Sequence, residues 1–362
     1  MLRTLTISTP GRICLFGEHQ DYLGLPVIAA AISLRMRISG APRADLRFQI
    51  ELPDIRQRLD FIPHGRLAYR LERDYFRSGF NVVWERGFRP QHGWQCEVRG
   101  EVPINSGTSS SSALMVAWIK FLLTAAHDPQ QNDCEVIARL AYQAEVREFN
   151  EPGGMMDHFS TCYGHVIYLD FSNNEVESLK PKLGAFVLGD SQQPKDTKNI
   201  LRNVRDVAQA AANMMRSFLP QFDLRQTLLE EAKDALKKLP PRHAEVLRAN
   251  LIDRDLLREA HLVLQQEPLD HSRLGDLLNQ HHEQLRRYKK VSTPKIEHML
   301  ENAMKAGALG GKINGSGGGG CMFAYAPQHS EVVAEAIREA GGVPYLVSID
   351  AGARLEVNNE NS

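Results

Sequence analysis

The sequence predicts an α+β fold, with strands and helices mixed in the first half and a block of helices in the second. Alternation of apolar and polar residues at strand spacing runs through much of 3–52 and returns at 94–98, whereas helical spacing fills most of 197–306. The chain has 362 residues, enough for two domains whose cores need no disulfide or metal. We therefore predict two domains, 1–183 and 184–362.

Composition and charge exclude several classes of protein. Lys and Arg number 43 against 44 for Asp and Glu, a formal net charge of −1, so no overall field favours nucleic acid or an anionic membrane. The five cysteines form no C-x-x-C pair, which argues against a disulfide framework and a zinc site. No signal peptide core appears, and no apolar run reaches the roughly 20 residues of a membrane helix. We expect a soluble cytoplasmic protein without a nucleic-acid or membrane partner; its oligomeric state stays open.

The N-terminal segment predicts a hairpin that ends in a polar cluster. Residues 3–8 alternate as a strand, Pro10-Gly11 indicates a turn, and 12–16 reads as a second strand before the polar residues 17–22. Further strands are expected at 27–34, 36–38 and 46–52, and a helix at 66–88. Charged groups between apolar strands are typical of a site, and a solvated hairpin loop is the equal alternative.

A serine-rich loop in front of a helix forms the clearest candidate for an anion site. The sequence VPINSGTSSSSALMVAWIKF covers residues 102–121, and the helix is expected to begin near Ser109 to Ser111, with Ser109 to Ser112 as possible caps. The first N–H groups of a helix have no partner within it and the helix dipole is positive there, so a phosphate can bind without a lysine. An ordinary capped helix or a serine-rich linker is the alternative.

A carboxylate follows a glycine-rich break further along the chain. Residues 134–149 predict a second helix, Pro152-Gly153-Gly154 ends it, and Asp157 begins a short helix before a strand at 166–171. A rigid scaffold of this kind can present a carboxylate to a ligand. The alternative is that Asp157 only faces the dipole of its own helix.

The second half predicts a strand at 185–189 and then helices, broken at Pro220, Pro240-Pro241 and Pro268. The basic run Arg286-Arg287 with Lys289-Lys290 is most simply a solvated helix face rather than a ligand patch.

The glycine-rich segment GGKINGSGGGGCMFAY at 310–325 lies between two predicted strands. A dinucleotide-binding G-x-G-x-x-G should open a helix, and a P-loop needs Ser or Thr after its lysine, whereas Ile313 follows Lys312. Both motifs are therefore rejected. What remains is a glycine turn that a neighbouring backbone or a phosphate approaches closely, or a purely structural hairpin.

Three segments in this order resemble the three motifs of the GHMP kinases, the family of galactokinase, homoserine kinase, mevalonate kinase and phosphomevalonate kinase. They are PGRICLFGEHQDY, VPINSGTSSSSAL and INGSGGGGC, and GGMMDHF lies where galactokinases have their catalytic segment. The resemblance spans nearly the whole chain. It implies a GHMP kinase fold with an N-terminal domain like ribosomal protein S5 and a ferredoxin-like C-terminal domain with added helices.

The resemblance also implies roles for individual residues in transfer from ATP with Mg²⁺. Asp157 matches the carboxylate that faces the accepting hydroxyl, and Arg12 matches the cation that would keep it ionised. Ser111 and Glu145 match the ligands of Mg²⁺, which prefers oxygen donors. The residues expected to contact ATP are Gly107, Thr108, Ser109, Ser110, Ser111, Ser112, Gly317 and Gly318.

A sugar is the substrate that the resemblance favours. Glu18, His19 and Asp21 match galactokinase residues that hold sugar hydroxyls, and Gly154 is assigned to the same substrate site. Mevalonate kinases lack an acid at the position of Asp21. The resemblance also implies phosphorylation at the anomeric hydroxyl. Cys14, Thr108 and His158 depart from the galactokinase pattern, so the substrate can be galactose or another hexose, a uronic acid or a modified sugar.

Two other functions stay open. A mevalonate-type kinase is supported by the segment LFGEH and the alanine-rich strand after it. A sensor that binds ATP and sugar without turnover is the other, and the complete set of Arg12, Ser111, Glu145 and Asp157 argues against it.

Overall fold

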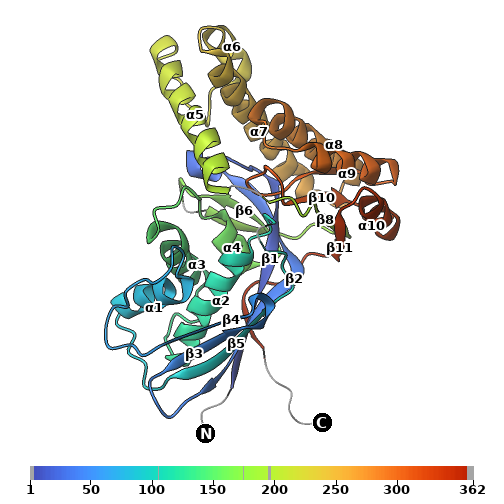
Figure 1. The fold of residues 1–362 in the computed structure, drawn as a ribbon. Helices are drawn as coiled ribbons and strands as arrows, with labels where there is room; N and C mark the ends of the chain where they lie inside the picture. Colours follow the sequence, from blue (N-terminus) through green and yellow to red (C-terminus); the bar gives the residue numbers. More distant parts are fainter. Residues whose placement is uncertain (1–3, 105, 174, 195–196, 357–362) are drawn as a thin grey trace.

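The computed structural model describes residues 4–104, 106–173, 175–194 and 197–356. A large, mostly antiparallel sheet crosses the molecule in the order β12-β1-β2-β5-β3-β4, with β6 pairing with β2 and β7 pairing with β6 (Figure 1). Its strands are β1 (Leu5–Phe16), β2 (Val27–Pro42), β3 (Phe48–Leu52), β4 (Gln57–Phe61), β5 (Trp94–Gly100), β6 (Val166–Asp170), β7 (Glu175–Leu179) and β12 (Arg354–Glu356). Short 3-10 turns lie at η1 (Asp21–Leu23) and η2 (Pro53–Ile55).

Helices of the first half cover one face of this sheet (Figure 1). They are α1 (Tyr75–Glu85), α2 (Ser110–Ala125), α3 (Cys134–Tyr142) and α4 (Met156–Tyr163). Because side chains alternate along a strand, Cys14 faces these helices whereas its neighbours Ile13 and Leu15 face the opposite side. Trp118 and Phe121 of α2 fill the core between the helices and the sheet.

A smaller sheet packs on the other side with the order β11-β8-β10-β9, and its strands are β8 (Phe186–Asp190), β9 (Gly310–Ile313), β10 (Cys321–Tyr325) and β11 (Val343–Val347). In chain order this is a 4-1-3-2 arrangement, the expected ferredoxin-like topology. Phe323 of β10 shares a core with the first strands of the large sheet, whereas Met322 faces the opposite side, where α9 (Pro294–Lys305) and α10 (Ser330–Glu339) pack.

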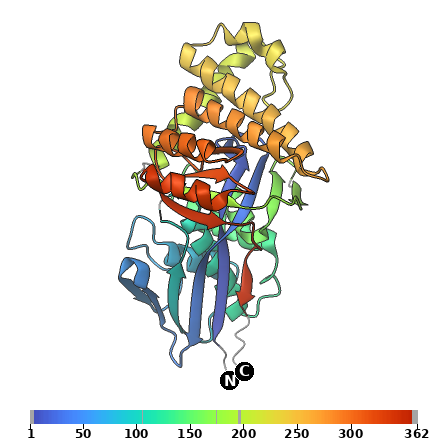
Figure 2. The same cartoon turned by 90° about the vertical axis from the view of Figure 1, so that its right-hand side faces the viewer.

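The second half also carries the added helices, which stand above the smaller sheet in Figure 2. They are α5 (Thr197–Phe218), α6 (Leu229–Leu236), α7 (Pro241–Leu264) and α8 (His271–Glu283), with a π-helical turn η4 (Gln284–Lys289) after α8, whereas α9 and α10 pack on the smaller sheet itself. Within the described residues, none of the helices is both long enough and apolar enough to span a bilayer.

The α+β fold class is confirmed, and several local predictions are wrong. Pro10-Gly11 is not a hairpin turn, because β1 continues through it with a shift in register against β2. The two strands expected at 27–38 form the single strand β2. Of the segment 66–88, which we expected to be one helix, only α1 is helical, because the residues before it form irregular chain.

The chain returns to the large sheet at its C-terminal end. Strand β12 pairs antiparallel with β1, and Ile349 bridges Ile32 just before it. The domain boundary at 183/184 stays a prediction. The pairing of β12 with β1 shows that a strand from beyond this boundary belongs to the large sheet.

Candidate active site

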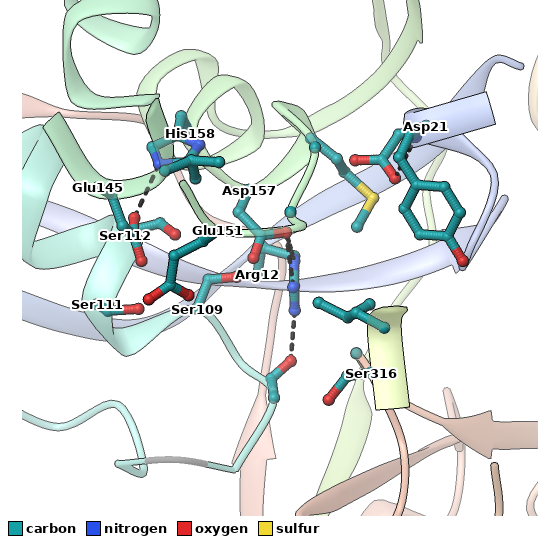
Figure 3. A pocket seen from close by; sticks show the side chains of 18 of the residues that line it. Arg12, Asp21, Ser109, Ser111, Ser112, Glu145, Glu151, Asp157, His158 and Ser316 are labelled. Atoms are coloured by element: carbon teal, nitrogen blue, oxygen red, sulfur yellow. Dashed lines mark hydrogen bonds and ion pairs between the residues drawn. The ribbon is translucent and has the colours of Figure 1, made fainter. Parts of the chain in front are cut away.

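A pocket opens between the serine-rich loop, the polar residues after β1 and the start of α4 (Figure 3). It holds about 1040 Å³ of space, part of which is open to solvent. Its lining includes the expected catalytic pair, the expected metal ligands and the expected substrate residues. Residues that lie 300 positions apart in the sequence, such as Cys14 and Asn314, contact each other beside it.

The serine-rich loop points the N-terminus of α2 at the pocket. Gly107 has φ of 87°, and Ser109, the residue before the helix, has φ of 63°. The Ser109 hydroxyl does not cap the helix as expected, because an N-cap residue normally has an extended backbone and this one is left-handed. The first N–H groups of α2 therefore stay open to an anion, and Ser110, Ser111 and Ser112 line the pocket beside them.

The glycine-rich turn between β9 and β10 packs on the backbone of the serine-rich loop. A Cβ atom on Gly315 would lie 2.8 Å from the Gly107 carbonyl oxygen, and one on Gly320 would lie 2.6 Å from that of Ser106. The Cys321 N–H donates to the same Ser106 oxygen at 2.6 Å. We expected either a neighbouring backbone or a phosphate to approach these glycines, and the structure shows a neighbouring backbone.

Gly317 and Gly318, which we expected to contact ATP, pack against other parts of the chain. The Gly318 N–H donates to the Val291 carbonyl at 2.6 Å, and a Cβ atom on Gly317 would lie 2.4 Å from the same oxygen. A Cβ atom on Gly318 would lie 2.2 Å from the Ile200 side chain. The residues of this turn that line the pocket are Gly315 and Ser316.

An ion pair between Arg12 and Asp157 lies at the centre of the pocket (Figure 3). Arg12 Nε donates to Asp157 Oδ1 at 2.8 Å, and Arg12 Nη2 lies 2.6 Å from the same oxygen. The third guanidinium nitrogen donates to the Gly107 carbonyl. The Arg12 side chain is 4% exposed and that of Asp157 is 29% exposed, so the arginine is fixed while the carboxylate is reached from the pocket.

The backbone of β1 explains how Arg12 reaches this position. A Cβ atom on Gly11 would lie 2.9 Å from the carbonyl oxygen of Thr108, so the loop can approach the strand this closely only at a glycine. The Arg12 N–H donates to the same oxygen at 3.2 Å. Thr108 itself is fully buried, and its backbone carbonyl holds the serine-rich loop against β1.

The two carboxyl groups nearest the centre differ in their pKa values. Burial raises the pKa of Asp157, but the charge of Arg12 and hydrogen bonds from Ser109 and Arg12 outweigh it, so that the pKa lies below its usual value. Burial and the negative charge of Asp157 together raise the pKa of Asp21 to about 6. Asp157 is therefore ionised at neutral pH, whereas Asp21 titrates close to it.

Glu145 enters the pocket from a π-helical turn, η3 (Gln143–Arg147), that continues α3 where we expected regular helix. His158 Nε2 donates to Glu145 Oε2 at 2.8 Å, since a carboxylate can only accept. Ser111 lies on the same side of the pocket (Figure 3).

The donors on this side fit a metal ion that is held mainly by a nucleotide. Within the described part of the chain, no group of three or more His, Cys, Asp or Glu side chains could hold a metal ion. One carboxylate from Glu145 and one hydroxyl from Ser111 are oxygen donors, which suit Mg²⁺ when phosphate oxygens and water complete its shell.

Glu18 holds protein partners with both carboxylate oxygens. Its Oε2 forms an ion pair with Lys312, and its Oε1 accepts the Gly315 N–H. The side chains of Glu18 and Lys312 are 2% and 0% exposed. Glu18 thus ties the loop after β1 to the glycine-rich turn, and its contact with a sugar stays a prediction.

His19 and Asp21 also lie in the loop after β1. His19 Nδ1 accepts from the Tyr22 hydroxyl at 2.9 Å, and its Nε2 donates to the Ser316 carbonyl at 3.1 Å. The Asp21 carboxylate lies against Gly154, where a Cβ atom would be 1.8 Å from its Oδ2. The glycine at 154 therefore makes room for the acid at 21.

Lys289 is the one residue of the basic run for which the expected solvated face is wrong. It is buried, forms a 2.8 Å ion pair with Asp253, and donates to the Glu18 carbonyl at 3.2 Å. Arg286, Arg287 and Lys290 are exposed, as expected. Successive residues of a helical turn point in different directions, so one of these four cations falls on the inner face.

Sequence reasoning missed Arg73 and Glu151, which line the pocket as a pair. Arg73 Nε and Nη2 donate to the two Glu151 oxygens at 2.7 Å each. The Pro-Gly-Gly break directly after Glu151 was the only local signal for it. In the aromatic segment 75–94, Tyr75 lines the pocket whereas Phe80 lies in the core.

Comparison with known proteins supports one family. The chain matches the profiles described as "GHMP kinases N terminal domain" over 66–165, "GHMP kinases C terminal" over 257–343 and "Galactokinase galactose-binding signature" over 3–42. It is 30% identical to a galactokinase of Actinobacillus succinogenes, over 90% of this chain and 86% of the relative. It is 29% identical to a mevalonate kinase of Pyrococcus furiosus, over 96% and 97%.

The solved structure of Lactococcus lactis galactokinase complexed with galactose has the same fold. It aligns with a TM-score of 0.84 at 21% identity, over 97% of this chain and 95% of that one.

Proposed function

Since the chain belongs to the GHMP kinase family, and is therefore a phosphotransferase with an alcohol group as acceptor and ATP as donor, we propose that its acceptor is a sugar and that the anomeric hydroxyl is phosphorylated. One observation carries the choice of a sugar. The galactose-binding signature covers 3–42, and Asp21 within it lies in the same pocket as Asp157. A carboxylate at this position suits the hydroxyl groups of a sugar, which need fixed acceptors.

The phosphates of ATP bind at the start of α2 in this proposal. The free N–H groups there and the positive end of the helix dipole hold negative charge, and the serine hydroxyls at 109–112 add donors. Ser111 and Glu145 would hold the Mg²⁺ that accompanies the nucleotide. When bound, this ion neutralises charge on the phosphate oxygens during transfer.

Asp157 acts on the acceptor hydroxyl in this proposal. Its low pKa keeps it ionised, so it can accept the hydrogen of the hydroxyl as the phosphoryl group is transferred. Arg12, fixed by Gly107 and Asp157, lowers the cost of negative charge on the acceptor oxygen. In-line transfer then depends on positioning and on charge rather than on a covalent intermediate.

The experiment that tests the proposal measures ADP release from Mg-ATP with a panel of acceptors. The panel contains galactose, its uronic, amino and deoxy relatives, mannose, other hexoses and mevalonate, and phosphorus NMR identifies the phosphorylated position. An anomeric sugar phosphate is the expected product. Activity with mevalonate alone would overturn the proposal in favour of the mevalonate-type kinase that the Pyrococcus relative suggests.

Gly154→Ala is expected to lower kcat/KM for the acceptor by about 100-fold, because displacement of a binding group by about 1 Å has an effect of this size. The added methyl group would overlap the Asp21 carboxylate at 1.8 Å. Gly153→Ala, assayed with a neutral acceptor, is the matched control, since a Cβ atom there meets only Val146 Cγ2 at 3.8 Å. Steady-state kinetics of both variants make the comparison. Equal losses in the two variants would show that the close contact with Asp21 does not matter.

The raised pKa of Asp21 predicts a pH dependence of acceptor binding. Above its value of about 6 the carboxyl is ionised and accepts hydrogen bonds with both oxygens, and below it the added proton removes acceptor capacity. We expect kcat/KM for the sugar to fall as the pH drops through 6. Asp157 contributes nothing to this step because its pKa is lowered.

Asp21→Asn provides the control for this pH profile. Titration of ATP itself is common to both proteins and cancels in the ratio of their kcat/KM values. If the ratio stays constant between pH 5 and 7, Asp21 does not titrate in the complex and the assignment is wrong.

A further inference from the structure

A second pocket adjoins the first on the far side of Asp21. It holds about 970 Å³ of space, part of which is open to solvent. Six residues line both pockets, namely Asp21, Tyr22, Val146, Glu151, Gly153 and Gly154. Two of them are glycines, which add no side chain where a small molecule would extend from the first pocket into the second. The serines of the phosphate-binding loop line only the first pocket, so the second lies away from the expected triphosphate.

The charges that line the second pocket are mainly positive. Arg147, from the π-helical turn, is exposed and forms no ion pair with the residues that the structure describes. Arg205, from α5, is 29% exposed. Among the described residues it forms an ion pair only with Asp206, whose side chain is 55% exposed. An exposed pair of this kind is weak, so it leaves Arg205 open to a better partner.

The acids of the second pocket do not balance these arginines. Glu151 is held by both guanidinium nitrogens of Arg73, which neutralises it. Asp21 is the remaining carboxylate of this pocket. Burial and the negative charge of Asp157 disfavour its ionised form, as its raised pKa indicates. Two guanidinium groups thus line this pocket with one carboxylate that is not already paired, and guanidinium groups are well suited to bind a carboxylate or a phosphate.

We propose that Arg147 and Arg205 bind an anionic substituent of the acceptor, so that the natural substrate is a sugar that carries a carboxylate or a phosphate group away from its anomeric carbon. This inference rests on the proposed sugar kinase function and names the substrate class of the same site. The sugar ring lies between Asp157 and Asp21, and the anionic group extends past Gly153 and Gly154 to the arginines.

The test compares a neutral hexose, its uronic acid and its 6-phosphate as acceptors, with the wild-type chain and with Arg147→Gln and Arg205→Gln. We expect one of the two anionic sugars to exceed the neutral hexose in kcat/KM by about ten-fold or more. Each substitution should lower that value by about ten-fold through KM, with kcat and the neutral hexose changed by less than about two-fold. The better of the two anionic sugars distinguishes a carboxylate from a phosphate.

Arg216→Gln is the matched control, because it removes the same charge from the helix of Arg205 at an exposed position whose side chain donates to Asn213 Oδ1. It should change none of these values. Higher ionic strength should raise KM for the anionic sugar in the wild-type chain and much less in Arg147→Gln.

Two results would contradict the inference and can be told apart. A preference for the neutral hexose that neither arginine substitution alters would overturn the anion site while the sugar kinase function stands. Activity with no sugar at all would instead overturn the proposed function, and the inference with it.

Discussion

Asp157→Asn is expected to lower kcat by about a thousand-fold while the Kd for ATP changes by less than about two-fold. Asparagine keeps an oxygen that accepts from Arg12 Nε, so the ion pair becomes a hydrogen bond and the pocket keeps its shape. It cannot accept a proton at neutral pH, and it no longer compensates the charge of Arg12. Single-turnover phosphoryl transfer, with ATP binding measured by calorimetry, separates the two effects.

Asp170→Asn is the control for the general loss of an ion pair. Asp170 is 5% exposed and pairs with Arg225 at the end of β6, and it belongs to neither pocket described above. Its substitution should leave kcat nearly unchanged. Turnover that persists in Asp157→Asn would remove the catalytic assignment, whereas unchanged biological signalling without turnover would favour the sensor.

The sequence identified the parts of the site that lie in continuous motifs. Arg12 and Asp157 were paired in advance because each lies in a recognisable segment, and the structure brings their side chains within 2.8 Å of each other. The serine-rich loop was recognised for the same reason, since a glycine, a run of serines and an amphipathic helix are all local features.

Partners that are distant in sequence and carry no motif were not predictable. Lys312 was considered only as a possible P-loop lysine, yet it pairs with Glu18, 294 residues away. Lys289 was grouped with three exposed cations, although the packing of its helical turn against Asp253 buries it. Such pairs depend on how elements distant in the sequence pack together, which no window of local sequence reports.

Local geometry was also harder to predict than element type. Pro10-Gly11 is typical of a turn, but the loop that packs on Gly11 keeps the strand continuous and shifts its register. The π-helical turn that carries Glu145 adds one residue to a helix whose composition is ordinary. Both irregularities lie beside the pocket, where tertiary contacts override local preference.

The ion pair between Glu18 and Lys312 is buried, so the loss of either partner alone should cost much stability. Either Glu18→Gln or Lys312→Met leaves an uncompensated charge in the interior, and we expect each to lower the free energy of unfolding by about 3 to 5 kcal/mol. Lys312 Nζ also donates to the carbonyl oxygens of Cys14 at 2.8 Å and Ile313 at 3.1 Å, which lose a donor in the methionine variant. Urea titration followed by tryptophan fluorescence measures the change.

The double variant shows whether the charge pair or the substrate explains the role of Glu18. With both charges removed, the loss should be smaller than the sum of the single losses, because neither partner is left unpaired. Glu230→Gln is the control, since Glu230 and Lys233 are 81% and 60% exposed and such a pair contributes less than about 1 kcal/mol.

If Glu18→Gln instead leaves stability intact and raises only the KM for the sugar, Glu18 binds substrate directly, as its motif suggests. If the loss of stability is as large as expected, its carboxylate mainly holds the loop after β1 against the glycine-rich turn, and it positions Asp21 and His19 through that loop.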